Sequence, residues 1–169
     1  MPSPTGDLSQ SSLEHNRSAR PRKAWKAWIP AIVWLGVIAI ESTGTFSAAN
    51  TRGWLYPIFH FLTGVDPVRF VAWHNVLRKL GHFVGYFTLS VLLFRAWRAS
   101  LPVPQLRLWT ARWAGIAWAM SALVASLDEW HQTYLPSRTG TVHDVILDSA
   151  AALAAQMVIW AIRGGRVGS

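Results

Sequence analysis

The stretch from Ser126 to Asp148, SLDEWHQTYLPSRTGTVHDVILD, decides how the rest of the chain is interpreted. Long apolar runs flank it, from Leu108 to Leu127 and from Val145 to Ile162. Ionisable groups at or inside a bilayer boundary are costly, so they are usually paired and often functional. The stretch therefore indicates a polar site at the ends of two membrane spans. It holds half of the eight acidic residues of the chain, namely Asp128, Glu129, Asp144 and Asp148.

The composition is that of a membrane protein with a single domain. Of the 169 residues, 51% are hydrophobic and 14% are charged, whereas a soluble domain has roughly 25% charged residues. Eleven tryptophans are too many for a soluble core but suit a membrane interface. Because cysteine is absent from the sequence, disulfides, thiolate metal sites and cysteine nucleophiles are excluded.

Four apolar runs predict an all-α, polytopic membrane protein with four transmembrane helices. The first run, from Ala27 to Ile40, follows a basic cluster and is slightly shorter than the roughly 20 residues that span a bilayer. The second run starts near Arg78 and ends near Trp97, and the third and fourth flank the polar stretch. A cleaved signal peptide is the alternative for the first run, but the long basic tail and Glu41 favour a span.

The remaining segments are assigned to one loop and two tails. Trp54–Leu62 is aromatic and apolar but too short to span, so we expect a short interfacial or re-entrant segment in the first outer loop. Residues 1–23 are polar and predict a disordered tail. The membrane domain then covers residues 24–163, and residues 164–169 form a second tail.

Basic residues are distributed unequally between the two sides of the predicted bundle. Eleven of the 16 Lys and Arg residues lie in the N-terminal tail, around the loop between the second and third spans, or in the C-terminal tail. This excess marks the cytoplasmic side, so both termini are expected in the cytoplasm and the polar stretch at the outer face of the inner (plasma) membrane. Contact with anionic lipids accounts for the net charge of +8, and nucleic acid is not expected as a partner.

A second group of polar residues lies where the second span begins. Lys79, His82 and Tyr86 are spaced i, i+3 and i+7, which places them on one face of a helix. Gly81 and Gly85 form a small-xxx-small pair beside that face. The glycine pair predicts that a neighbouring helix approaches closely there.

The fourth span combines acidic and small residues on one face. Asp144 and Asp148 are four residues apart, so their carboxylates share a helix face. The small residues Ala151, Ala152 and Ala155 extend that face and predict tight helix packing.

The end of the third span and the loop after it add further polar groups. Asp128 reaches Gln132 one turn later if the third helix extends that far. Arg138 follows Pro136 in a short loop, where a guanidinium can clamp a carboxylate or a phosphate through two hydrogen bonds.

In their order along the chain, these motifs resemble the VanZ-like family. Two departures from the family pattern stand out: Asp148 replaces the usual Asn, and Ala151 and Ala152 stand where a glycine is usual. The first adds a charge, and the second loosens the expected helix contact. The resemblance rests on Lys79, His82, Phe83, Tyr86, Ser126, Asp128, Glu129, Gln132, Pro136, Arg138 and Asp144.

The resemblance implies a small polytopic membrane protein with a role in the bacterial cell envelope. The family is named after an accessory factor in resistance to teicoplanin, a glycopeptide antibiotic that acts on cell-wall precursors. No enzymatic activity is implied by the resemblance, and none is assigned here.

Three classes of function remain open. The preferred one is a binding or accessory protein whose outer pocket holds an anionic lipid-linked or cell-wall-related ligand with Lys79, His82 and Arg138. The second is a membrane-embedded hydrolase or transferase that acts on a lipid phosphate. The third is a proton-coupled carrier, which would have to be a dimer because four spans without a repeat are too few. Membrane lipids, a lipid-linked cell-wall precursor and a second copy of the chain are the expected partners.

No catalytic residue, cofactor or metal is assigned from the sequence, although carboxylate oxygens suit magnesium or calcium. The alternative to a functional site is a buried ion-pair network that fixes the loop between the last two spans. The residues assigned to the polar site are Lys79, His82, Tyr86, Asp128, Glu129, Gln132, Arg138, Asp144 and Asp148.

Overall fold

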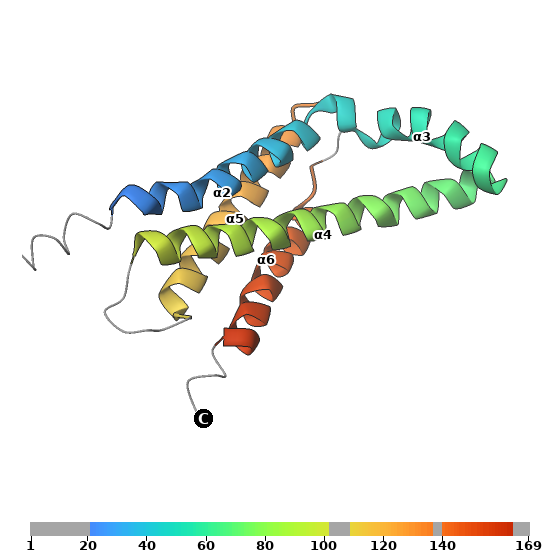
Figure 1. The fold of residues 1–169 in the computed structure, drawn as a ribbon. Helices are drawn as coiled ribbons and strands as arrows, with labels where there is room; N and C mark the ends of the chain where they lie inside the picture. The colour runs from blue at the N-terminus through green and yellow to red at the C-terminus, as the bar shows by residue number, and fades with distance from the viewer. Residues whose placement is uncertain (1–20, 102–108, 137–139, 164–169) are drawn as a thin grey trace, which may run out of the picture.

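The computed structural model describes residues 21–101, 109–136 and 140–163. All regular elements in these ranges are helical, which confirms the prediction of an all-α fold (Figure 1). Nearly all of the two predicted tails, and the loop residue Arg138, lie outside the described residues. The elements are α2 (Pro21–Glu41), the 3-10 helix η1 (Gly44–Phe46), α3 (Ala48–Thr63), α4 (Pro67–Ser100), α5 (Ala111–Gln132) and α6 (Val142–Arg163).

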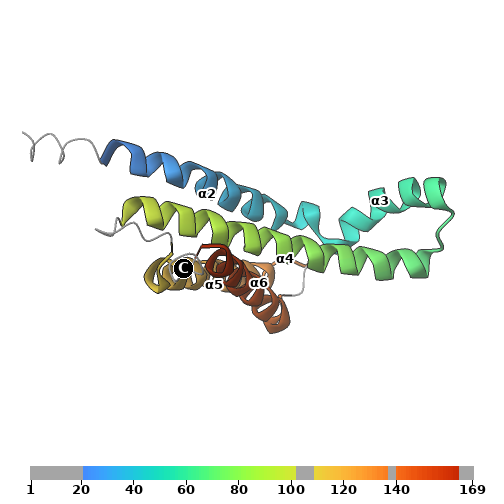
Figure 2. The ribbon, with the colours of Figure 1, turned by 60° about the horizontal axis from the view of Figure 1, so that its bottom comes forward.

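Four of these helices form a bundle around α4. Helix α4 contacts α2, α5 and α6, and α5 also packs against α6. Figure 2 shows α2 along one side of α4 and the pair α5 and α6 on the other. Because α4 touches α2, α5 and α6, its side chains lie at the centre of the core. The buried apolar residues of this core include Ala31, Tyr86, Leu89, Leu93, Phe94, Trp113, Ala117 and Ala151.

Three helices, α2, α4 and α6, are long and apolar enough to cross a membrane. Each contains a predicted span and extends beyond it. Helix α5 has 22 residues, but Arg112 at its start and Asp128 and Glu129 near its end leave a shorter apolar stretch between them. The fourth crossing therefore stays a prediction.

Helix α4 begins earlier than expected because Asp66 and Pro67 start it. The side chain of Asp66 accepts hydrogen bonds from the backbone N–H groups of Val68 and Arg69, both at 3.0 Å. Proline at the first position of a helix loses no hydrogen bond and has the required φ. Asp66 and Pro67 thus form the N-terminus of a helix that has 34 residues.

The predicted interfacial or re-entrant segment is part of α3, a helix of 16 residues. Helix α3 ends at Gly64, whose φ of 66° is the left-handed conformation that glycine adopts most easily. The chain then turns back, and α3 lies along the N-terminal half of α4 (Figure 1). Phe70 of α4 packs against Tyr56 and Phe59 of α3, with ring centroids 5.2 and 5.7 Å apart. The segment is therefore one arm of a helical hairpin, and a re-entrant path is not confirmed.

Small residues bring α4 and α6 together, as the sequence predicts. Ala151 and Ala152 are completely buried. The Ser90 hydroxyl donates to the Ala152 carbonyl at 2.9 Å, and the Gln156 amide donates to the Ser90 hydroxyl at 2.7 Å. These buried polar bonds fix the register between the two helices.

The close helix approach predicted at Gly81 and Gly85 is wrong. A methyl group added at either glycine would meet no other atom within 4 Å, leaving aside the backbone of its own helix. The carbonyl of Gly85 instead accepts a hydrogen bond from the Trp34 indole at 2.9 Å. A long tryptophan side chain bridges α2 and α4 here, so the two helices need not touch at the glycines.

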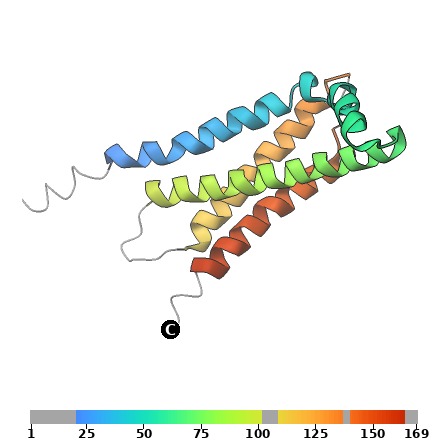
Figure 3. The same cartoon turned by 45° about the vertical axis from the view of Figure 1, so that its right-hand side comes forward.

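Tryptophans also tie the helices together at one end of the bundle. The Trp28 indole donates to the Ser100 hydroxyl at 2.8 Å, and the Trp113 indole donates to the Leu101 carbonyl at 3.0 Å. Figure 3 shows that this end holds the start of α2, the end of α4, the start of α5 and the end of α6. The acidic residues of α5 and α6 therefore lie toward the opposite end.

Candidate functional site

The polar residues of three bundle helices converge away from the tryptophan-rich end. We call this group the polar cluster, and its members pair through hydrogen bonds or lie within a few ångströms of one another. Helix α4 contributes two side chains, α5 three and α6 one. The members are His82, Tyr86, Asp128, Glu129, Gln132 and Asp148.

His82 and Asp148 join α4 to α6 in the cluster. The Nδ1 atom of His82 lies 3.2 Å from Oδ2 of Asp148, which is a hydrogen bond and, with a protonated imidazole, an ion pair. The Asp148 side chain is completely buried, and among the described residues its Oδ1 atom has no hydrogen-bond partner. Among the described residues, His82 is therefore the hydrogen-bond partner of this buried carboxylate.

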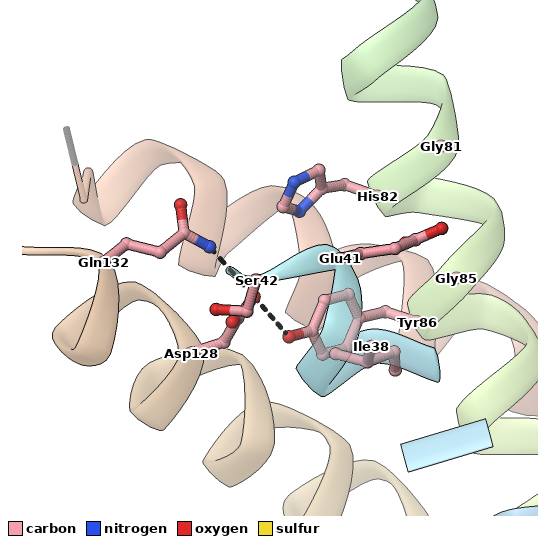
Figure 4. A pocket seen from close by; sticks show the side chains of 9 residues that line it. All are labelled: Ile38, Glu41, Ser42, Gly81, His82, Gly85, Tyr86, Asp128 and Gln132. Atoms are coloured by element: carbon pink, nitrogen blue, oxygen red, sulfur yellow. Dashed lines mark hydrogen bonds between the residues drawn. The ribbon is translucent and has the colours of Figure 1, made fainter. Parts of the chain in front are cut away.

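Tyr86 and Gln132 hold the carboxylate of Asp128. The Tyr86 hydroxyl donates to Oδ2 of Asp128 at 3.1 Å, and the Gln132 amide donates to the same oxygen at 3.2 Å (Figure 4). The bond between Asp128 and Gln132 confirms that the third predicted helix extends to Gln132. His82 and Tyr86 lie one turn apart, and their rings stack with centroids 6.4 Å apart.

Glu129 connects α5 to the loop that starts α6. Its Oε2 atom accepts a hydrogen bond from the backbone N–H of Thr141 at 2.8 Å. The Thr141 hydroxyl in turn donates to Oδ2 of Asp144 at 2.9 Å, so Asp144 joins the cluster indirectly. A methyl group at Gly140 would collide with the Glu129 carbonyl, so this close approach requires a glycine. Gly140 and Thr141 were not predicted as site residues.

Two cavities in the described part of the chain are lined by His82 of the polar cluster. The smaller one is drawn in Figure 4, has a volume of about 20 Å³ and is lined by Ser42, Tyr86, Asp128 and Gln132 among others. That volume holds about one water molecule or ion. The larger one, the α3 cavity, lies between η1, α3, α4 and the end of α2 and has a volume of about 310 Å³. Its lining residues are Glu41, Phe46, Thr51, Trp54, Leu55, His74, Leu77, Arg78, Gly81 and His82.

The cation beside the α3 cavity is Arg78. Lys79, which the sequence pattern favours, is exposed on α4. Arg78 lies one turn before His82 and lines the same cavity. The spacing i, i+4 between these two residues was a signal available in the sequence.

Two further contacts were missed because they join distant parts of the chain. The Ser42 hydroxyl at the end of α2 lies 3.3 Å from Nδ1 of His131 on α5. On α3, the Thr51 hydroxyl lies 2.9 Å from Nε2 of His74, which is buried and belongs to α4. No local sequence pattern indicates these partners.

The comparisons with known proteins agree with the motifs. A family model described as VanZ/LLP1 matches residues 27–163, which include most of α2, all of α4, α5 and α6, and every member of the polar cluster. The comparisons with curated proteins and with solved structures found no significant match. Together with three helices able to cross a membrane, the match confirms the predicted resemblance: the chain is a membrane protein that belongs to the VanZ/LLP1 family.

Proposed function

We propose that this protein binds the phosphate group of a lipid-linked cell-envelope molecule in the α3 cavity. The observation that carries the proposal is that Arg78 and His82 line one cavity whose other walls are largely apolar. A guanidinium recognises phosphate through two parallel hydrogen bonds. A cation above apolar walls is the arrangement that a phosphorylated lipid requires.

His82 is oriented for this role by Asp148. The Nδ1–H group of the imidazole donates to Oδ2 of Asp148, which leaves Nε2 as the nitrogen for a phosphate ligand. Glu41 lines the same cavity and can accept hydrogen bonds from hydroxyl or amide groups next to the phosphate.

The size and surroundings of the cavity suit the head of a lipid. Its volume of about 310 Å³ lies at the lower end of the range for ligand pockets, roughly 300–1,000 Å³. Trp54 and Leu77 line it and are half exposed. A lipid chain can therefore leave the cavity along the apolar surface of α3 and α4.

The excess of basic residues at the opposite end of the bundle supports an extracytoplasmic position for this cavity in the plasma membrane. A lipid-linked cell-wall precursor is then the preferred ligand class. Such a ligand would also account for the link to teicoplanin that the family resemblance carries, because that antibiotic acts on cell-wall precursors.

The proposal is tested by native mass spectrometry of the gently solubilised full chain. We compare the wild type with Arg78→Gln and with Arg69→Gln, which removes an exposed arginine from the same helix. We expect the wild type and Arg69→Gln to retain a phosphate-bearing lipid and Arg78→Gln to lose it. Equal retention by all three proteins would show that the cavity arginine does not bind the ligand.

A further inference from the structure

Three members of the polar cluster are arranged like the ligands of a metal ion. His82, Glu129 and Asp148 each offer one ligand atom, and these three atoms lie within 4.8 Å of one another. They come from α4, α5 and α6, so the site exists only in the folded bundle. The Nδ1 atom of His82 and Oδ2 of Asp148 are 3.2 Å apart. Two ligands of a tetrahedral ion, each about 2.0–2.1 Å from it, are separated by about 3.3 Å.

The burial of the two carboxylates is the second observation. Glu129 is 4% exposed and Asp148 is completely buried. The Oδ1 atom of Asp148 is buried without a hydrogen-bond partner among the described residues. Buried carboxylates are normally paired with a cation or fully hydrogen-bonded. Within the cluster, His82 is one basic group for two such carboxylates, so a bound cation would supply the missing charge and the missing partner.

From this geometry we infer that His82, Glu129 and Asp148 bind a divalent first-row transition metal ion, with Zn²⁺ as the probe. Magnesium and calcium prefer oxygen ligands, whereas an imidazole nitrogen suits zinc and its neighbours. Three protein ligands leave the fourth position of a tetrahedral ion open, as in catalytic zinc sites. Of the four acidic residues in the stretch from Ser126 to Asp148, only Glu129 and Asp148 belong to this group, and His82 is its third member.

Neighbouring groups hold the ligands in place. The backbone N–H of Thr141 fixes Glu129 through Oε2. Such outer contacts orient metal ligands and raise affinity. Because His82 also lines the α3 cavity, a phosphate oxygen bound there can take the open position. The binding of a phosphate oxygen to the metal ion rests on the proposed function, whereas the binding of the metal ion itself does not.

The test measures Zn²⁺ binding by the full chain without any lipid ligand. The protein is purified with a tag that contains no histidine, stripped with a chelator and dialysed against Zn²⁺, and bound metal is quantified by elemental mass spectrometry. We expect one tightly bound Zn²⁺ per chain, and at least tenfold weaker binding in Glu129→Gln and Asp148→Asn. His60→Asn and Asp66→Asn remove the same types of group from the hairpin of α3 and α4 and should bind like the wild type.

Circular dichroism and gel filtration establish which variants fold. Loss of binding in an unfolded variant does not identify a metal ligand, so the wild type is also measured with Co²⁺. We expect the visible spectrum of the bound Co²⁺ to show coordination by nitrogen and oxygen atoms. Absence of tight Zn²⁺ binding by the wild type, or equal binding by folded Glu129→Gln, overturns the inference. Binding of Mg²⁺ in preference to Zn²⁺ also overturns it. A protein that retains a phosphate-bearing lipid but binds no Zn²⁺ refutes the metal site and leaves the proposed function standing.

Discussion

Asp128 receives two hydrogen bonds on a single oxygen, and the one from Tyr86 crosses between helices α4 and α5. Replacing Tyr86 with phenylalanine removes this donor and keeps the ring. We expect Tyr86→Phe to lower the free energy of unfolding by about 1.5 kcal/mol, because the acceptor is charged and partly buried. Chemical unfolding in detergent measures the change. Tyr134→Phe alters an exposed tyrosine and should have no effect; if both variants behave alike, the bond to Asp128 contributes nothing.

Gly140 allows the backbone to approach α5 closely enough for Thr141 to reach Glu129. An added methyl group would clash with the Glu129 carbonyl and would lie 2.8 Å from Cγ2 of Thr133. Gly140→Ala is therefore expected to destabilise the protein by about 1–3 kcal/mol, the usual cost of overpacking. Gly53→Ala is the matched control, because a methyl group there meets nothing within 4 Å. Thermal unfolding of the two variants measures the loss of stability. An unchanged melting temperature of Gly140→Ala would show that the loop can move away from α5 without cost.

At the scale of single residues, the sequence predicted which polar residues share a helix face, but it did not predict the hydrogen bonds between different helices. The spacing of His82 and Tyr86 predicted a shared helix face, and their stacked rings confirm it. The bond between His82 and Asp148 depends on how α4 and α6 are rotated against each other, and no local pattern contains that information. Lys79 was favoured over Arg78, although the i, i+4 spacing of Arg78 and His82 was visible in the sequence. Arg138 lies outside the described residues, so its guanidinium clamp stays a prediction.

At the scale of the elements, the contact between α4 and α6 depends on small side chains. Ala152 is completely buried, and its carbonyl accepts a hydrogen bond from Ser90. A leucine at this position would push the two helices apart and break the buried bonds of Ser90, at a cost of at least about 1–3 kcal/mol. Ala150→Leu places the same side chain on an exposed position of α6. We expect Ala152→Leu to unfold at a clearly lower temperature and Ala150→Leu to resemble the wild type; equal melting temperatures would contradict the packing described here.

Helices with a long apolar stretch were predicted correctly, and the hairpin of α3 and α4 was not. Its first arm, α3, contains Gly53 and Pro57. Because glycine and proline normally indicate a loop, the sequence did not predict a helix of this length. The arm is stabilised by tertiary contacts such as the packing of Phe70 against Tyr56. The glycine pair on α4 predicted a close helix contact that the structure does not show, because a methyl group at either glycine would meet nothing within 4 Å.

At the scale of the whole molecule, the orientation in the membrane and the fourth crossing are open to a direct test. Since the chain has no cysteine, single cysteines can be labelled in intact cells with a membrane-impermeant maleimide. Tyr134→Cys should react from outside, whereas Trp25→Cys and Ala111→Cys should react only after permeabilisation. All three positions are exposed in the structure. Labelling of Ala111→Cys in intact cells would show that α5 does not cross the membrane. Labelling of Trp25→Cys in intact cells would show that the predicted orientation is wrong.

The central claim, a phosphate-bearing lipid in the α3 cavity, is tested most directly by photo-crosslinking in living cells. A photoreactive amino acid replaces Leu55, which lines the cavity, and in a second protein it replaces Phe61, which is 88% exposed on the same helix. Mass spectrometry identifies the adducts at each position. We predict that a phosphate-bearing lipid-linked precursor is enriched at position 55 and that bulk phospholipid dominates at position 61. The same adducts in the same proportions at both positions would contradict the proposed binding site.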